Sequence, residues 1–158
     1  LTANPVAALF GWVTPKFGEV LDEVRDLLFE RAAQDQDIPG VVFTFVWAFN
    51  EPRETETIDR LSSKFVRSGG TVHFVELLAS LDTRIQREGS LFRRKHKPNQ
   101  DNKEEAAERQ RMFEAQYAMN SPGTLPLAYP HLVIDTERSS EDASAEMVVQ
   151  FVRQQSGA

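Results

Sequence analysis

Six basic side chains are concentrated in a short stretch of this chain, which we call the basic segment (residues 84–97). The stretch contains one acidic residue, Glu88, so its net charge is +5 in a chain whose net charge is −6. Arginine presents planar, bidentate N–H donors that remain charged at neutral pH, which suits it to binding phosphate. We therefore expect the segment to neutralise a polyanionic phosphate during binding or transfer. The basic residues are Arg84, Arg87, Arg93, Arg94, Lys95 and Lys97.

The composition excludes several other kinds of site. The chain has no cysteine, which excludes disulfides, thiol catalysis and cysteine-based zinc sites, and His73, His96 and His131 are too isolated to share a metal ion. The acidic net charge argues against general coating of nucleic acid. No apolar run approaches the roughly 20 residues of a membrane span, so we expect a cytoplasmic protein with no membrane partner. A length of 158 residues fits one domain.

Strands and helices must position these residues, and the first half of the chain predicts two long helices on either side of one strand. Apolar residues at helical spacing predict a helix over about Pro15–Ala33, with proline in its first turn. The run Val41–Trp47 is almost continuously β-branched or aromatic, which predicts a strand buried on both faces of a parallel sheet. A helix that buries Ile58 and Leu61 follows, and Gly69-Gly70 ends it.

The second half continues the alternation of strand and helix. The predicted elements are a strand at Thr71–Leu78, a helix at about Leu81–Arg87, a helix from about Glu104 and a final strand at His131–Asp135. A last helix, capped by Ser139 or Ser140, is expected to bury Ala143, Met147, Val148 and Phe151. This order predicts an α/β protein with a parallel sheet covered by helices.

The order of elements, with an arginine-rich lid between two helices and a final strand followed by Asp-Thr, resembles the C-terminal three-quarters of the small P-loop kinases. That group includes shikimate kinase, adenylate kinase and chloramphenicol phosphotransferase, and the chain is also similar to bacterial shikimate-kinase-like or AAA-family ATPases. The resemblance implies a three-layer P-loop architecture in one domain, residues 1–158, with a basic lid at residues 88–103. The matching phrases are Leu1–Val6, Val42–Val46, Val75–Ser80, Ser90–Lys97 and Leu132–Thr136.

The chain departs from this family in one large respect. These kinases begin with a strand and the motif G-x-x-x-x-G-K-[ST], whose backbone amides, lysine and hydroxyl hold the ATP phosphates and Mg²⁺. The sequence has no Gly-Lys pair, and the family places the motif just ahead of the segment matched by Leu1-Thr2. The resemblance therefore implies that a preceding segment with the central strand is missing. We expect the remaining chain to be weakly stable, unable to bind ATP normally and inactive by itself.

The resemblance also assigns roles to named residues. The lid residues would supply cations to the transferred phosphoryl group, although Arg84 and Arg87 would also suit the C-terminus of a helix. The loop after the last strand would hold adenine, or serve only as the entry loop of a helix. Arg25 would pair with an anionic group of the acceptor, or lie over neighbouring leucines. The implied catalytic residues are Arg84, Arg87, Arg93, Arg94 and Lys97, the cofactor-binding residues are Asp135, Thr136 and Arg138, and the substrate-binding residues are Asn4, Arg25 and Asn50.

Two functions are consistent with these observations. The first is an ATP-dependent phosphotransferase that uses ATP and Mg²⁺ and acts on a small-molecule acceptor by positioning and charge neutralisation. No aspartate lies between Phe43 and Trp47, where many relatives hold Mg²⁺ through water, so no metal ligand is predicted. The second is a non-catalytic domain that binds a nucleotide or docks an anionic partner such as RNA. Phe92 is the one aromatic residue among the basic ones, which disfavours nucleic acid.

Overall fold

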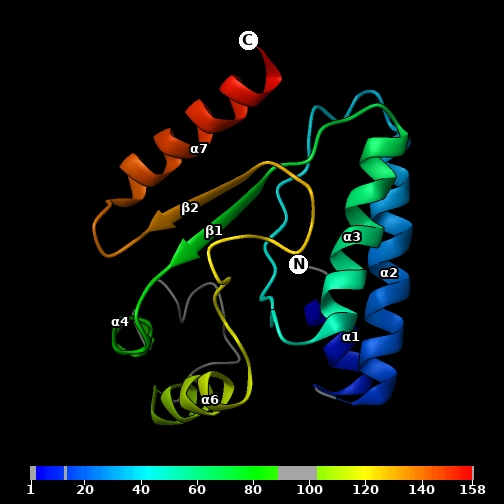
Figure 1. Cartoon of the computed structure of the whole chain (residues 1–158). Helices are drawn as coiled ribbons and strands as arrows, with labels where there is room; N and C mark the ends of the chain where they lie inside the picture. The colour runs from blue at the N-terminus through cyan, green and yellow to red at the C-terminus, as the bar shows by residue number, and fades with distance from the viewer. Residues whose placement is uncertain (1–2, 13, 89–102, 158) are drawn as a thin grey trace. The chain divides into compact units, whose positions relative to one another are not determined.

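The structure is a computed structural model that describes residues 3–12, 14–88 and 103–157 (Figure 1). Most of the predicted lid, with Arg93, Arg94 and Lys97, lies outside the described residues. Contacts between residues divide the chain into two compact units. Unit 1 comprises Leu1–Phe45 and Glu56–Val72, and unit 2 comprises Val46–Thr55 and His73–Ala158.

Unit 1 is built from helices whose ends follow the sequence signals. The hydroxyl of Thr14 accepts a hydrogen bond from Phe17 N (3.1 Å) and Pro15 occupies the first turn, so α2 begins where it was predicted. Gly69, with a φ of +82°, follows α3 in the left-handed conformation expected of a helix-ending glycine. The helices are α1 (Ala3–Phe10), α2 (Pro15–Gln34) and α3 (Pro52–Arg67), which enters unit 1 at Glu56.

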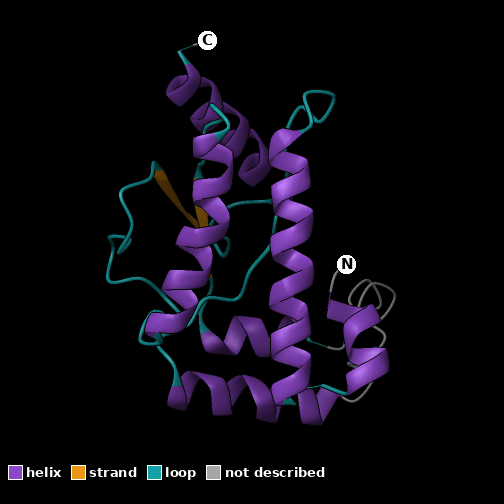
Figure 2. Cartoon of the chain, turned by 90° about the vertical axis from the view of Figure 1, so that its right-hand side faces the viewer, coloured by secondary structure: helices purple, strands orange, loops and turns teal. Residues whose placement is uncertain are grey.

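Ion pairs join α2 to α3, which lie side by side in Figures 1 and 2. Asp26 pairs with Arg60 and Lys64, and Glu30 accepts a hydrogen bond from Lys64 Nζ (3.0 Å). The hydrogen bond from Lys64 lowers the pKa of Glu30. The rings of Phe29 in α2 and Phe65 in α3 lie 5.7 Å apart between centroids, so the helices also share an apolar contact. Leu61 of α3 is only 1% exposed.

The prediction of a strand at Val41–Trp47 is wrong. These residues form no strand, and Val42 and Val46 are 99% and 67% exposed, so the run is not buried on both faces. Phe43 is half-buried, with its ring 4.9 Å from that of Phe29 in α2. A strand exists only where a neighbour accepts and donates its backbone hydrogen bonds, and the sheet in the described part of the chain does not include this run.

Unit 2 contains the sheet. β1 (Phe74–Leu78) and β2 (His131–Asp135) pair in parallel, with Phe74 opposite His131 and Leu78 opposite Asp135 (Figure 1). β2 has its predicted bounds, whereas β1 begins at Phe74 rather than at Thr71. At the start of β1, Phe74 N donates to Pro130 O (2.8 Å). The described part of the chain is therefore an α/β protein with a two-stranded parallel sheet.

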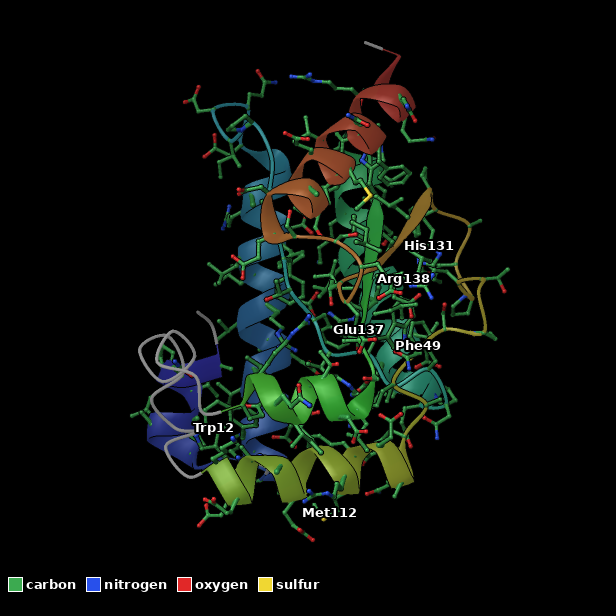
Figure 3. All side chains as sticks on the ribbon, turned by 90° about the vertical axis from the view of Figure 1, so that its left-hand side faces the viewer. Trp12, Phe49, Met112, His131, Glu137 and Arg138 are labelled. Atoms are coloured by element: carbon green, nitrogen blue, oxygen red, sulfur yellow. The ribbon has the colours of Figure 1, made fainter. Side chains whose placement is uncertain are left out.

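Two helices of unit 2 border the residues that are not described. α4 (Leu81–Arg87) follows β1, and α6 (Lys103–Gln116) packs against α4 (Figure 3). Both helices begin at or within one residue of their predicted first residues. Arg84 of α4 forms an ion pair with Glu114 of α6. Gln110 Nε2 donates to Glu88 Oε1 (3.1 Å), and Glu88 is only 2% exposed. Polar contacts therefore hold the two helices together.

α7 (Glu141–Ser156) follows β2, and its cap settles one of the predicted alternatives. The hydroxyl of Ser140, rather than that of Ser139, accepts a hydrogen bond from Ala143 N (3.2 Å). The predicted burial of α7 is wrong, because a sheet of two strands is too narrow to cover the apolar face of the helix. Ala143 is exposed, and Met147, Val148 and Phe151 are half-buried.

Candidate functional site

A hollow of about 280 Å³ lies at the carboxyl ends of the two strands. Parallel strands bring their carboxyl ends to the same edge of a sheet, and open α/β sheets bind ligands at that edge. The lining comes from the connection between β1 and α4, the loop after β2 and the loop after α6. It consists of Leu78, Ala79, Ser80, Asn120, Asp135 and Glu137.

Thr136 fixes the loop after β2 against the end of β1. Its amide N and its hydroxyl both donate to Leu78 O, at 2.9 and 2.8 Å, which extends the strand pairing by one residue. Arg87 of α4 donates from Nη1 to Thr136 Oγ1 (2.9 Å) and from Nη2 to Thr136 O (2.8 Å). One edge of the hollow is therefore held by contacts among β1, α4 and the loop after β2.

Glu137 is bound to the start of α4. Its Oε1 accepts hydrogen bonds from Ser80 N (2.9 Å) and Ser80 Oγ (2.5 Å), and Ser80 also accepts from Thr83 N (3.2 Å) as the helix cap. The Ser80 hydroxyl, followed by that of Thr83, lowers the pKa of Glu137 to about 2. Glu137 is therefore an anion at neutral pH and is unsuited to proton transfer. Figure 3 shows Glu137 beside the ribbon of β1, near α4.

Asp135 organises the turn that follows β2. Its Oδ1 accepts a hydrogen bond from Glu137 N (2.9 Å), and its Oδ2 lies 3.2 Å from Nε of Arg138. The Arg138 side chain is 87% exposed, so this ion pair is a surface pair that stabilises the fold by about 1 kcal/mol at most. Asp135 is thus positioned by its own turn.

The exposed lining of the hollow is mostly apolar, and its polar side chains are Ser80, Asn120, Asp135 and Glu137. The carboxylates of Asp135 and Glu137 accept hydrogen bonds only, and the Asn120 amide both donates and accepts. Such a lining suits an uncharged, largely apolar group that carries N–H or O–H donors rather than a phosphate. Its volume is just below the roughly 300–1,000 Å³ of pockets for drug-sized ligands, so it is suited to one part of a larger molecule.

Among the predicted residues of unit 2, the structure brings Asp135, Thr136, Arg138 and Arg87 together at this edge. The predicted roles of these residues and of Arg84, which pairs with Glu114, stay predictions. Asn50 binds elsewhere in the unit, because its Oδ1 accepts from Ala118 N (2.8 Å) and its Nδ2 donates to Gln116 O (3.3 Å). Both polar atoms of the Asn50 side chain therefore hold the end of α6.

The predicted substrate residues of unit 1 lie on two helices. Asn4 is exposed on α1. Arg25 of α2 is half-buried, and its Cζ lies 5.5 Å from the ring centroids of both Phe43 and Phe45. The guanidinium therefore packs over two aromatic faces in a cation–π arrangement.

Sequence reasoning missed two polar residues of the hollow, Ser80 and Asn120. Ser80 carried a usable signal, because a serine between a strand and a helical pattern indicates a helix cap at the carboxyl edge of the sheet. Glu137 belongs to the loop that the resemblance assigned to adenine, although it was given no role of its own. Asn120 had no local signal, since its position depends on how the loop after α6 returns to the sheet.

Comparison of the chain with models of protein families, with curated proteins and with solved structures gave no match. Within the described ranges, no group of three histidine or acidic side chains has an arrangement that would hold a metal ion. None of the helices in those ranges combines the length and the apolar character needed to cross a membrane.

Proposed function

We propose that the chain contributes a nucleoside site and a basic lid to an ATP-dependent phosphotransferase of the small P-loop kinase type, with the three-layer architecture of that group. The observation that carries the proposal is the mostly apolar hollow with two carboxylates at the carboxyl edge of two parallel strands, next to the start of the helix that leads into the basic segment. ATP has an uncharged nucleoside end and a polyanionic end, which require opposite surroundings. The hollow and the basic segment provide those two kinds of surroundings in one unit.

The residues of the hollow fit the nucleoside end of ATP. The adenine amino group and the ribose hydroxyls are hydrogen-bond donors, and Asp135, Glu137 and Asn120 offer acceptors for them. The same carboxylates would repel the triphosphate and direct it away from the hollow. For Mg²⁺ the described residues provide no ligand cluster, so the proposal assigns no residue to the metal.

The phosphate end is assigned to the basic segment. ATP supplies the phosphoryl group when bound, and Arg93, Arg94 and Lys97 would contact it and neutralise its charge. Arg87 and Arg84 act through their neighbours, because they hold Thr136 and Glu114, and are positioning residues in this proposal. For the small-molecule acceptor, the proposal retains Asn4 and Arg25 of unit 1, whereas the Asn50 side chain of unit 2 holds the end of α6.

The proposal predicts that adenosine and ATP respond differently to substitutions in the two regions. Isothermal titration calorimetry would compare Asp135→Asn with the double variant Arg93→Ala/Arg94→Ala. We expect Asp135→Asn to weaken both ligands equally, since both contain the nucleoside. The double variant should weaken ATP about tenfold or more and leave adenosine unchanged, because charge-assisted hydrogen bonds to phosphate are lost.

Arg153→Ala, in the last turn of α7, is the matched control for loss of a positive charge and should change neither affinity. Failure of the unsubstituted chain to bind adenosine would refute the assignment of a nucleoside site. Equal weakening of ATP and adenosine by the arginine variant would refute the division into a nucleoside end and a phosphate end.

A non-catalytic nucleotide-binding domain is the second candidate. The observation that favours it is the engagement of Arg84 and Arg87 in contacts within the chain, which leaves two of the five implied catalytic cations with structural roles. This candidate predicts the same binding pattern without consumption of ATP in the presence of hydroxyl-bearing acceptors.

A further inference from the structure

Glu76, in the middle of β1, forms hydrogen bonds with the loop after α6, which also borders the hollow. Its Oε1 accepts a hydrogen bond from Ser121 N (2.8 Å), and its Oε2 accepts one from Ser121 Oγ (2.6 Å). His131 at the start of β2 places its Nε2 3.3 Å from the same Oε2, and the side chains of Glu76 and His131 are each 12% exposed. Burying a carboxylate costs free energy unless hydrogen bonds compensate for the lost contacts with water, and both oxygens of Glu76 have such partners.

The hydroxyl of Ser121 both donates and accepts a hydrogen bond. It donates to Glu76 and accepts a hydrogen bond from Gly123 N (3.2 Å). Gly123 has a φ of +92°, a conformation that favours glycine, so the turn after Ser121 is fixed as well. Glu76 therefore holds a defined turn.

Glu76 and the turn that it holds are both close to residues of the hollow, Glu76 along its strand and Ser121 along the chain. Side chains two residues apart on a strand share a face, so Glu76 lies on the same face as Leu78, and the register places Asp135 opposite Leu78. Leu78 and Asp135 line the hollow. Asn120, the residue before Ser121, lines it too.

The arrangement also excludes one other reading. Serine, histidine and glutamate together suggest a hydrolytic triad, in which histidine lies between the other two and takes the serine proton. Here the glutamate lies between them, since Ser121 Oγ and His131 Nε2 both approach Glu76 Oε2. The histidine is therefore not the base for this serine.

We propose that Glu76 is a positioning residue that, through Ser121, sets the location of Asn120 at the edge of the hollow and thereby tunes ligand affinity there. The part of this inference that concerns affinity rests on the proposed nucleotide site, whereas the placement of Asn120 does not. Glu76 touches no ligand in this scheme and acts by shaping the third side of the hollow.

The test uses Ser121→Ala, Ser121→Thr and Glu76→Gln in the whole chain. Amide hydrogen exchange would report the protection of Ser121 N–H or its replacement, and ¹⁵N–¹H spectra would report the side-chain amide of Asn120. We expect Ser121→Ala and Glu76→Gln to lower protection about tenfold and to shift the Asn120 signals. Ser121→Ala removes the hydroxyl bond that helps to hold the turn, and Glu76→Gln replaces a carboxylate that accepts two bonds with an amide that has one acceptor oxygen. Ser121→Thr keeps the hydroxyl and should restore both.

Ser63→Ala is the matched control, since the Ser63 hydroxyl donates to Arg60 O in unit 1, and it should leave the Asn120 signals unchanged. Unchanged exchange and unchanged Asn120 signals in Ser121→Ala would overturn the inference, whether or not a nucleotide binds. In calorimetry, the Kd for adenosine should rise about fivefold to tenfold in Ser121→Ala and recover in Ser121→Thr.

A displaced Asn120 with an unchanged Kd would overturn the effect on affinity and leave the proposed site intact. Absence of adenosine binding by the unsubstituted chain would refute the proposed function and the affinity effect together. The exchange measurement would then decide the placement of Asn120 by itself.

Discussion

At the scale of single residues, the charge state of Glu137 is set by hydrogen bonds rather than by burial. The side chain is exposed, yet the amide and hydroxyl of Ser80 bind its carboxylate and lower its pKa to about 2. Asp135 beside it is held by its own turn and by a surface arginine. Glu137 is thus the acid whose ionisation links the start of α4 to the loop after β2.

This lowered pKa predicts an acid-dependent loss of stability. Because the pKa of Glu137 is lower in the folded chain than the ordinary 4.5, the stabilisation is present above pH 4.5 and is lost as the pH falls towards 2. Glu137→Gln should therefore make the urea midpoint depend less on pH between 5.5 and 3.5. Glu146→Gln, at an exposed position of α7, is the control. Parallel pH profiles for Glu137→Gln and the unsubstituted chain would contradict the prediction.

Side chains at the site were predictable where their position along the chain was sufficient. Asp135, Thr136 and Arg138 follow the final strand directly, so their place at the sheet edge was accessible from the sequence. The partners of the arginines were not, because Arg84 meets Glu114 across 30 residues and Arg87 meets Thr136 across 49. Such pairs depend on helix and strand packing that local patterns do not encode.

At the scale of elements, helices were predicted better than strands for a physical reason. A helix satisfies its hydrogen bonds within one segment, so the spacing around Pro15 and the cap at Ser140 were informative. A strand needs a partner, and the run Val41–Trp47 has strand-forming residues without one in the described sheet. The hydrophobic pattern therefore identified residues suited to a strand but could not supply the neighbour.

The cap of α7 provides a quantitative test at this scale. Ser140→Ala removes the oxygen that accepts from Ala143 N and should lower the free energy of unfolding by about 1 kcal/mol, within the usual range of 0.5–2 kcal/mol. Ser139→Ala, one residue earlier, should change it by less than about 0.5 kcal/mol. Urea unfolding followed by far-ultraviolet circular dichroism measures both. A larger effect for Ser139→Ala than for Ser140→Ala would contradict the assignment of Ser140 as the cap.

At the scale of the whole molecule, each compact unit has its own buried side chains and its own tryptophan. Leu61, 1% exposed, belongs to unit 1 and Ile134, 2% exposed, belongs to unit 2. Trp12 lies 5.4 Å from Phe17 in unit 1, between ring centroids, and Trp47 stacks on Phe49 in unit 2. Fluorescence of single-tryptophan chains can therefore follow each unit separately.

We expect core substitutions to act chiefly on the unit that contains them. In a Trp47→Phe chain, Leu61→Ala should lower the free energy of unfolding reported by Trp12 by about 2–5 kcal/mol, because a buried side chain leaves a cavity. In a Trp12→Phe chain, Ile134→Ala should do the same for the signal of Trp47. The free energy of unfolding should change less when Leu61→Ala is followed by Trp47 or when Ile134→Ala is followed by Trp12.

Surface substitutions separate loss of the core from a general effect of truncation. Val66→Ala on α3 and Val149→Ala on α7 remove atoms from side chains that are each 48% exposed, and should change stability by less than about 0.5 kcal/mol. Equal shifts of both tryptophan signals by Leu61→Ala would show that the two units unfold as one cooperative body. A shift confined to Trp12 would show that each unit draws its stability from its own core.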